Sequence, residues 1–410
     1  MSLASKEVAQ NAPLTDSLKR WTSLFYLKSA VGLETIAAPT LTIFYLQYCR
    51  YSFLEFSLLL SMIATLLWII EVPVGALADK FGRKPVLILG SCFYLLAMGA
   101  LLVFKRDVPI LVTALFFAIG TSASTGTFQS MMFQAFDSAG RQLEYHSVAA
   151  KGTTISLYAA SAAAIVGGAL SERSLALPMV VDMFLMGLVT LALALYVQEP
   201  SNPSKSATRP ALVEIIREAT KQTVSSRELI LIIFCSALCF AALRTGFNFY
   251  QPMLSDTGTS YQLMGVCFAG FSLFSAVAAH FFSKAPDEAL IQSVPIALMA
   301  IFFFGASLIA WQFGTTTIGV ILAILCHQVC RAMFPSFFSF AINRRIPTDS
   351  SARTTVLSIS SLVRAIVLAS VLALSGLSGE TFTYSISFFI LSLVVGGTLF
   401  VVSLTGIRKV

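Results

Sequence analysis

Charged residues are scarce in this chain. Asp, Glu, Lys and Arg make up 11% of its 410 residues, whereas soluble proteins carry about 25%. Hydrophobic residues reach 57%, and the mean hydropathy is +0.83. These values exclude an ordinary water-soluble domain. The long apolar runs predict an all-α integral membrane protein, because a bilayer core of about 30 Å requires about 20 apolar residues per helix.

The sequence also lacks the residues of several kinds of chemistry. It has no Gly-x-x-x-x-Gly-Lys-Ser/Thr loop for nucleotide phosphates. Its 3 histidines lie far apart in sequence, which makes a membrane-embedded enzyme a weak alternative. Its 7 cysteines lie in or beside apolar runs and are typical of small buried residues. Cys326-His327-x-x-Cys330 does not match known ligand spacings. We expect no enzyme activity, no cofactor and no metal site.

The apolar runs predict twelve transmembrane helices, arranged as two six-helix bundles. The expected spans are 22–47, 54–78, 85–104, 108–134, 148–170, 175–197, 228–250, 261–283, 289–312, 315–342, 354–376 and 382–405. Residues 1–197 form the first bundle and 228–410 the second. Residues 198–227 form a cytoplasmic linker, which begins Pro/Ser-rich and continues into an amphipathic helix.

Lys and Arg are distributed asymmetrically about the predicted membrane. With both termini cytoplasmic, 19 of the 27 lie in or next to the inner segments and 4 lie in the outer loops. This bias predicts the orientation by the positive-inside rule, in a cell inner (plasma) membrane. It also explains the net charge of +7 without nucleic acid as a partner. We expect a monomer surrounded by lipid.

A polar loop between the second and third predicted helices reads Gly75-x-x-x-Asp79-x-x-Gly82-Arg83-Lys84. It resembles the signature loop of the major facilitator superfamily, whose members are twelve-helix secondary transporters. Two further stretches, Phe136–Tyr145 and Asn343–Ser358, resemble the loops after helix 4 and before helix 11 of that family.

The resemblance implies a cytoplasmic gate that opens as the two halves rock. In this gate Asp79 lies near the start of helix 11 and Arg83 pairs with Asp137. Gly82 would permit the turn, and Gly75 would allow a close helix contact. The expected gate residues are Glu71, Gly75, Asp79, Gly82, Arg83, Asp137, Arg141 and Arg353.

Two departures argue against a standard drug antiporter. The Arg that many such antiporters carry four residues before a Gly in helix 4 is replaced by Phe116, before Gly120. In helix 5, Gly167-Gly168 lack the preceding Gly-Pro.

Ionisable residues inside the predicted helices are candidates for the transport pathway, because such groups cost at least about 2.5 kcal/mol to insert. Helix 1 carries Lys28 and Glu34. Glu34 is the leading candidate for a proton carrier, and an ion pair with another helix is an equal alternative. The expected pathway residues are Lys28, Glu34, Arg244, Asn248, Gln251, His327, Arg331 and Arg364.

Cations outnumber acids among these residues, which favours an anionic or carboxylate-bearing solute. Each of them could instead pair structurally or extend to an interface. The resulting hypothesis is a secondary active transporter of a small organic, anionic or amphipathic solute. It would work by alternating access and proton-coupled efflux, with protons and the solute as partners. Import of an organic anion, such as a metal chelate or a metabolite, is the main alternative. A channel is a further alternative.

Overall fold

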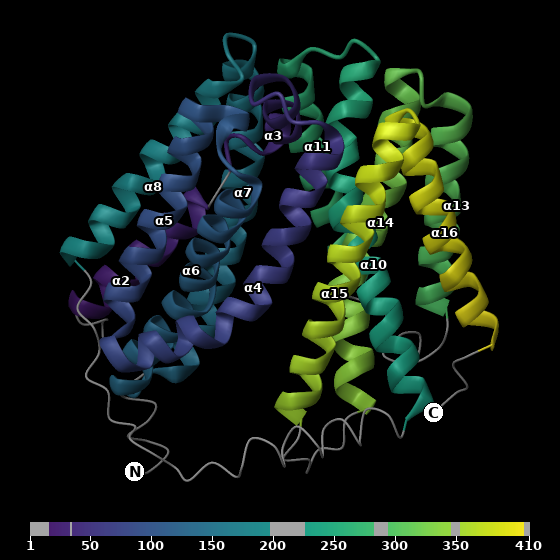
Figure 1. Ribbon diagram of the computed structural model, residues 1–410. Coiled ribbons are helices and arrows are strands. Elements are labelled where there is room, and N and C mark those ends of the chain that lie inside the picture. Colours follow the sequence, from purple (N-terminus) through teal and green to yellow (C-terminus); the bar gives the residue numbers. More distant parts are fainter. Residues whose placement is uncertain (1–15, 33–34, 197–225, 283–293, 346–352, 406–410) are drawn as a thin grey trace. The chain divides into compact units, whose positions relative to one another are not determined.

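The computed structural model describes residues 16–32, 35–196, 226–282, 294–345 and 353–405 (Figure 1). In that part of the chain every regular element is a helix. The predicted amphipathic helix of the linker lies outside the described residues, and so does Glu34. The helices are α2 (Asp16–Val31), α4 (Phe53–Phe81), α5 (Arg83–Phe104), α6 (Ile110–Ser138), α7 (Gln142–Ser171), α8 (Ala176–Tyr196), α10 (Arg227–Asp256), α11 (Tyr261–Phe282), α13 (Val294–Phe313), α14 (Thr317–Arg345), α15 (Arg353–Thr381) and α16 (Tyr384–Thr405), with short turns η1 (Ala38–Thr40), α3 (Leu41–Ile43), η2 (Phe44–Tyr48) and η3 (Lys105–Asp107).

Ten of the described helices are long and apolar enough to cross a membrane. The described part of α6 adds a shorter apolar stretch, Ile110–Ser124. The broken helix at the start of the chain accounts for the remaining predicted span. The structure is therefore all-helical and multi-pass, and it is consistent with twelve spans.

The first predicted span, 22–47, is not one continuous helix, so that prediction is wrong in detail. α2 ends at Val31, and Gly32 follows with a φ of +61°. The chain then turns through η1 and α3 and finishes in the π-helical turn η2. Pro39 within η1 has no N–H for a helical hydrogen bond. The break leaves backbone amides that need other acceptors.

The chain packs into two compact units. Unit 1 comprises Met1–Thr40 and Leu66–Lys205, and unit 2 comprises Leu41–Thr65 and Ser206–Val410. Residues 41–65 thus group with the second half, whereas the sequence prediction assigns them to the first bundle. Within unit 2, the Ser61 hydroxyl donates to the carbonyl oxygen of Ala369 over 2.8 Å. The Phe53 and Phe249 rings stack with centroids 4.9 Å apart.

Unit 1 has an apolar core between α2, α5, α6, α7 and α8. Its members are Leu18, Trp21, Phe25, Leu87, Phe128, Met131, Met132, Ala135, Phe136, Val148, Val189 and Leu193. Within this core the Phe25 and Phe128 rings stack 6.1 Å apart. α5 and α6 approach so closely that a Cβ on Gly90 would overlap Ala123. Small residues of this kind let membrane helices pack backbone to backbone.

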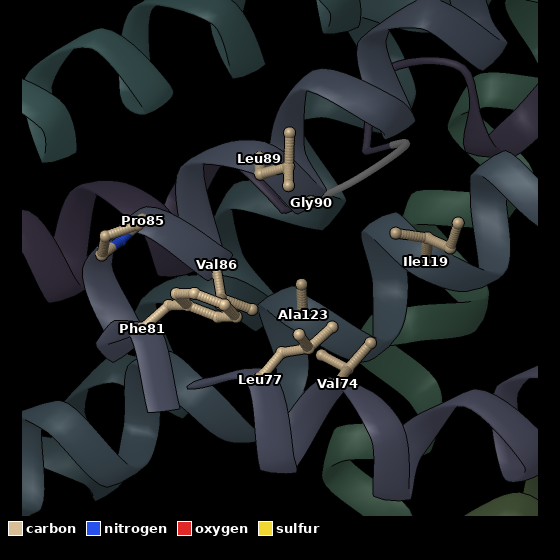
Figure 2. Close-up of a pocket in the computed structure, with 9 residues that line it drawn as sticks. All are labelled: Val74, Leu77, Phe81, Pro85, Val86, Leu89, Gly90, Ile119 and Ala123. Carbon is tan, nitrogen blue, oxygen red and sulfur yellow. The ribbon is translucent and has the colours of Figure 1, made fainter. Parts of the chain in front are cut away.

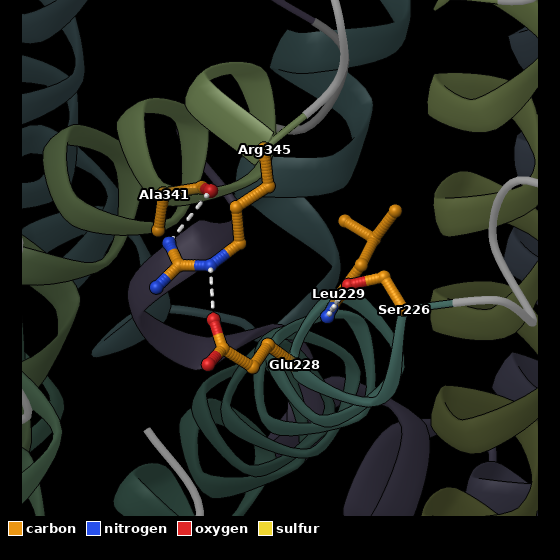
Figure 3. A network of polar contacts seen from close by, with 5 residues as sticks. All are labelled: Ser226, Glu228, Leu229, Ala341 and Arg345. Atoms are coloured by element: carbon orange, nitrogen blue, oxygen red, sulfur yellow. Dashed lines mark hydrogen bonds and ion pairs between the residues drawn. The ribbon is translucent and has the colours of Figure 1, made fainter. Parts of the chain in front are cut away.

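Unit 2 is organised around α10, which packs against α14, α15 and α16. The Ser226 hydroxyl caps the start of α10 by accepting from the Leu229 amide at 3.2 Å (Figure 3). Glu228 forms an ion pair with Arg345 of α14 over 3.5 Å (Figure 3). The Arg345 guanidinium also donates to the carbonyl oxygen of Ala341. These contacts join the first turn of α10 to the last turn of α14.

Candidate functional site

Lys28 lies near the end of α2, against α6. Its Nζ donates to the Ser124 hydroxyl at 2.8 Å and to the Ser124 carbonyl oxygen at 3.1 Å. The same ammonium lies 4.8 Å from the centre of the Phe128 ring, a cation–π distance. None of these contacts in the described part of the chain is a carboxylate. The sequence placed Lys28 among the pathway residues, and the structure holds it with neutral groups.

Asp182 of α8 satisfies the backbone at the break in the first helix. Its carboxylate accepts from the Ile36 amide at 3.1 Å and from the Ala37 amide at 2.8 Å. The Asp182 side chain is 1% exposed. The amides at the start of a helical segment carry partial positive charge, which favours a carboxylate. Asp182 is therefore a buried acid bound by main-chain donors in unit 1.

Gln251 of α10 plays a comparable part in unit 2. Its side-chain oxygen accepts from the Thr42 amide at 2.6 Å. The Gln251 side chain is fully buried. The sequence grouped Gln251 with Arg244 and Asn248 on one stripe, but their surroundings differ, because Arg244 is exposed and Asn248 half-buried. Gln251 thus supports the backbone of the chain near α3.

A polar chain links the α14 surface to the interior of unit 2. Arg331 donates to the Gln328 side-chain oxygen at 3.4 Å. The Gln328 amide donates to the Tyr250 hydroxyl at 3.5 Å. The Tyr250 hydroxyl in turn contacts Nδ1 of His327. We call these four residues the α14 relay. Each member can donate to the next, so the relay is a continuous chain of hydrogen bonds.

His327 ends the relay inside an aromatic enclosure. Its ring lies 5.1 Å from the Phe303 centroid and 5.3 Å from the Phe388 centroid, both nearly edge-on. The residue is fully buried, and its Nε2 has no hydrogen-bond partner in the described structure. Gly246 provides the room, because a Cβ there would overlap the imidazole. A buried nitrogen without a partner is unusual in folded proteins.

The arginines of unit 2 lie on three helices. Arg244 on α10 and Arg331 on α14 are exposed, and Arg364 on α15 is half-buried. The Arg364 guanidinium donates to the Ser361 hydroxyl at 3.0 Å. Arginine heads of this kind can bind a carboxylate or phosphate through two parallel hydrogen bonds.

The signature loop forms the predicted turn between α4 and α5. Gly82 has a φ of +95° immediately before α5, a conformation that favours glycine, so that prediction is confirmed. A Cβ on Gly75 would meet no atom of the described residues within 4 Å, and the close helix contact expected at Gly75 stays a prediction. Glu71 and Asp137 are exposed, and Arg83 is half-buried. Arg141 forms an ion pair with Glu144, three residues later. The side chains of Asp79 and Arg353 lie outside the described residues.

An apolar groove lies beside this loop in unit 1 (Figure 2). Its volume is about 340 Å³, and it lies between the last turns of α4, the start of α5 and the middle of α6. The residues that line it are Val74, Leu77, Phe81, Pro85, Val86, Leu89, Gly90, Ile119 and Ala123. None of them has a polar side chain.

Within the described residues, no group of three or more His, Cys, Asp or Glu side chains could hold a metal ion. In particular, His327 contacts Tyr250, and the Cys330 thiol lies 3.5 Å from the carbonyl oxygen of Met299.

Sequence reasoning missed two residues. Asp182 is not among the expected pathway residues, yet it is a lone acid in an apolar run, and the rule that selects Glu34 also selects it. Tyr250 has no such signal, because a tyrosine in an apolar helix is unremarkable until its hydroxyl meets His327.

The sequence matches a known protein family, and the fold matches solved structures. Residues 29–371 match the Major Facilitator Superfamily. A Bacillus subtilis (strain 168) protein described as "Uncharacterized MFS-type transporter YxaM" is 26% identical over 254 residues, which cover 60% of this chain. The matched segment spans 62% of that relative's length.

Solved structures share the fold at low sequence identity. The crystal structure of the nucleoside transporter NupG is 14% identical and has a TM-score of 0.72, with 95% of this chain and 98% of that chain covered. A POT family transporter in complex with 5-aminolevulinic acid is 13% identical and has a TM-score of 0.65, with 94% of this chain and 96% of that chain covered. A bacterial homologue of the human lysosomal transporter Spinster is 15% identical and has a TM-score of 0.62, with 99% of this chain and 98% of that chain covered.

Proposed function

The chain belongs to the major facilitator superfamily and is a multi-pass membrane transporter rather than an enzyme; from this premise we propose that it carries a small organic solute, anionic or amphipathic, by alternating access coupled to protons. The observation that carries the proposal is the set of arginines on α10, α14 and α15 of unit 2. A transport site needs only a few convergent polar groups to orient its solute. Guanidinium groups select a carboxylate or phosphate.

Lys28 supports the same solute chemistry from unit 1. Its ammonium is bonded to a hydroxyl and a carbonyl group, and among the described residues no carboxylate contacts it. A cation inside a membrane is costly to maintain unless an acidic group offsets its charge. A solute carboxylate would offset that cost while bound. A structural pairing or an interfacial position is the alternative role for Lys28.

Proton coupling is proposed on two grounds. Glu34 is the acid that the sequence selects as the proton carrier. Within the α14 relay, the Tyr250 hydroxyl and the His327 imidazole form a second pair of groups that can exchange a proton, and Gln328 and Arg331 extend the hydrogen bonding from this pair to the exposed surface of α14.

We further propose efflux across the inner membrane, with both termini in the cytoplasm and the protein acting as a monomer. The orientation is supported by the excess of Lys and Arg in the inner segments. The direction of transport has weaker support, because import of an organic anion would use the same cations.

A ligand screen is the first experiment. Purified protein is heated with panels of organic anions, neutral metabolites and organic cations, and its melting temperature is recorded. A ligand that binds the folded state raises that temperature, with about 2.7 kcal/mol of stabilisation at 100 times its Kd. We expect hits among carboxylates or phosphates. Hits confined to cations would contradict the proposal.

Transport is then measured in proteoliposomes with the best ligand and an imposed pH gradient. Flux that accelerates with the gradient supports coupling, and flux that is unchanged when the gradient collapses would remove it. Glu34→Gln should abolish coupled transport and preserve exchange. Saturation and counterflow would exclude a channel. Flux measured in each orientation of the protein separates efflux from import.

A further inference from the structure

The groove of Figure 2 has apolar walls along its whole length. Its base is the contact between α5 and α6, where Gly90 faces Ala123. Large side chains at its edges remain uncovered by protein: Leu77 is 46% exposed, Phe81 61% and Leu89 58%. These three exposed side chains extend the apolar surface beyond the edges of the groove.

One end of the groove is cationic. Phe81 and Pro85 line it there, and Lys80, Arg83 and Lys84 lie in the same loop. The Lys80 ammonium lies 5.1 Å from the centre of the Phe81 ring. The groove therefore has an apolar lining and, in the loop at Phe81 and Pro85, three basic residues. The same loop holds Asp79, whose side chain lies outside the described residues.

This combination identifies the kind of partner. A site for a polar solute would need hydrogen-bonding groups in its walls, and the side chains that line this groove are all apolar among the residues that the structure describes. An acyl chain needs none, and basic clusters on the cytoplasmic side of membrane helices bind anionic headgroups. We propose that the groove binds one acyl chain of an anionic phospholipid of the cytoplasmic leaflet, with its headgroup at Lys80 and Lys84.

The inference rests on the proposed orientation of the loop and is independent of the solute, the coupling ion and the direction of transport. The lipid would contact both walls of the turn at Gly82, since Phe81 precedes that glycine and Pro85 follows it. Leaflet composition would thereby act directly on the loop that the family resemblance assigns to the gate.

The test is native mass spectrometry of the purified protein. The protein is equilibrated with equal amounts of palmitoyl-oleoyl phosphatidylglycerol and palmitoyl-oleoyl phosphatidylethanolamine, and the retained lipids are counted. We expect selective retention of one phosphatidylglycerol. Each cation near a membrane surface contributes a factor of roughly fivefold to binding of an anionic lipid. Lys80→Gln and Lys84→Gln should therefore each lower the selectivity about fivefold, and the double variant about 25-fold.

Matched controls come from the opposite end of α5 and its following turn. Lys105→Gln and Arg106→Gln should leave the selectivity unchanged. Val86→Trp, which fills the groove, should lower retention of both lipids, whereas Val103→Trp at a 70% exposed position should not. Size-exclusion elution and the melting temperature show whether each variant is folded.

Three outcomes would overturn the inference. Equal retention of the two lipids would mean that the cations do not select a headgroup. Selectivity that survives in the Lys80 and Lys84 variants would place the anionic site elsewhere. Equal retention of a phosphatidylglycerol with six-carbon chains would mean that the groove does not hold the tail. Because the measurement involves no transport, a failed transport assay would leave this result intact.

Discussion

The two units differ in the polar groups that they hold in their interiors. In unit 1, Lys28 and Asp182 are charged side chains matched by a serine hydroxyl or by the main chain. In unit 2, the buried members of the α14 relay are neutral amide, phenol and imidazole groups, and the cationic head of Arg331 remains exposed.

This difference separates residues that stabilise the backbone from residues that can bind the solute. A carboxylate that accepts main-chain amides fixes a backbone conformation, and it has little capacity left for a solute. An exposed guanidinium such as that of Arg331 stabilises little by itself, but a ligand can reach it. We therefore expect substitution of Asp182 in unit 1 to act on stability, and substitution of Lys28 or of the surface arginines of unit 2 to act on the solute.

The largest effect should come from Asp182→Ala. The Ile36 and Ala37 amides would lose their acceptor, and each buried donor left unpaired costs about 1–3 kcal/mol. We expect a loss of roughly 2–6 kcal/mol of stability, measured by thermal or denaturant unfolding of the purified protein. Asp182→Asn keeps one carbonyl oxygen and should lose less. The exposed Asp107→Asn is the control. Wild-type stability in Asp182→Ala would remove the distinction between the units.

The next largest effect should come from Arg331→Gln, which should lower the affinity for an anionic ligand. A hydrogen bond to a charged group is worth about 1.5–3 kcal/mol, so affinity for an anionic ligand should fall about 10- to 100-fold with little change in stability. Arg331→Lys should keep the charge and lose the paired hydrogen bonds. Ligand titration by thermal shift measures both. The exposed Arg106→Gln serves as control. Unchanged affinity in Arg331→Gln would mean that the solute does not contact α14 there.

Tyr250→Phe tests the α14 relay. Removing the hydroxyl leaves Gln328 and His327 without their shared partner, and the expected loss of stability is about 1–2 kcal/mol. If the relay carries protons, coupled transport in proteoliposomes should slow while solute exchange continues. Tyr158→Phe, at a 68% exposed position, is the matched control. Equal slowing of exchange and of coupled transport would assign Tyr250 a purely structural role.

Lys28→Met should have the smallest effect on stability. Exchanging a buried charge for an apolar side chain of similar length is often neutral or stabilising, so we expect a change within about 1 kcal/mol. Transport should nevertheless be lost if Lys28 binds the solute. Lys105→Met in η3 is the control. Normal transport in Lys28→Met would show that unit 1 contributes no cation to the pathway.

Much of the fold was predictable because the bilayer imposes a single rule, namely that a long apolar run forms a helix. The expected spans 54–78 and 85–104 lie inside α4 and α5, and the turn at Gly82 was predicted from its sequence. The break after Val31 was not predicted. Hydropathy is continuous through it, and the side chain that makes it possible, Asp182, comes from a helix about 150 residues later.

The sequence predicted which types of residue form the candidate site, but it predicted their surroundings less well. Lys28, His327 and Arg331 stood out because polar groups in apolar helices are rare. Their partners did not, because Ser124, Tyr250 and Gln328 are ordinary residues whose importance depends on which helices meet. His327 is enclosed and Arg331 is exposed because of the way α10 packs against α14. A single sequence does not reveal that contact.

The fit between Gly246 and His327 has an evolutionary consequence. Any side chain at position 246 would occupy the space of the imidazole, so neither position can change freely while the other stays as it is. We expect the two positions to covary among relatives of this chain, with alanine or serine at 246 occurring together with a smaller residue at 327. An ancestor that acquired the histidine would have needed the glycine first.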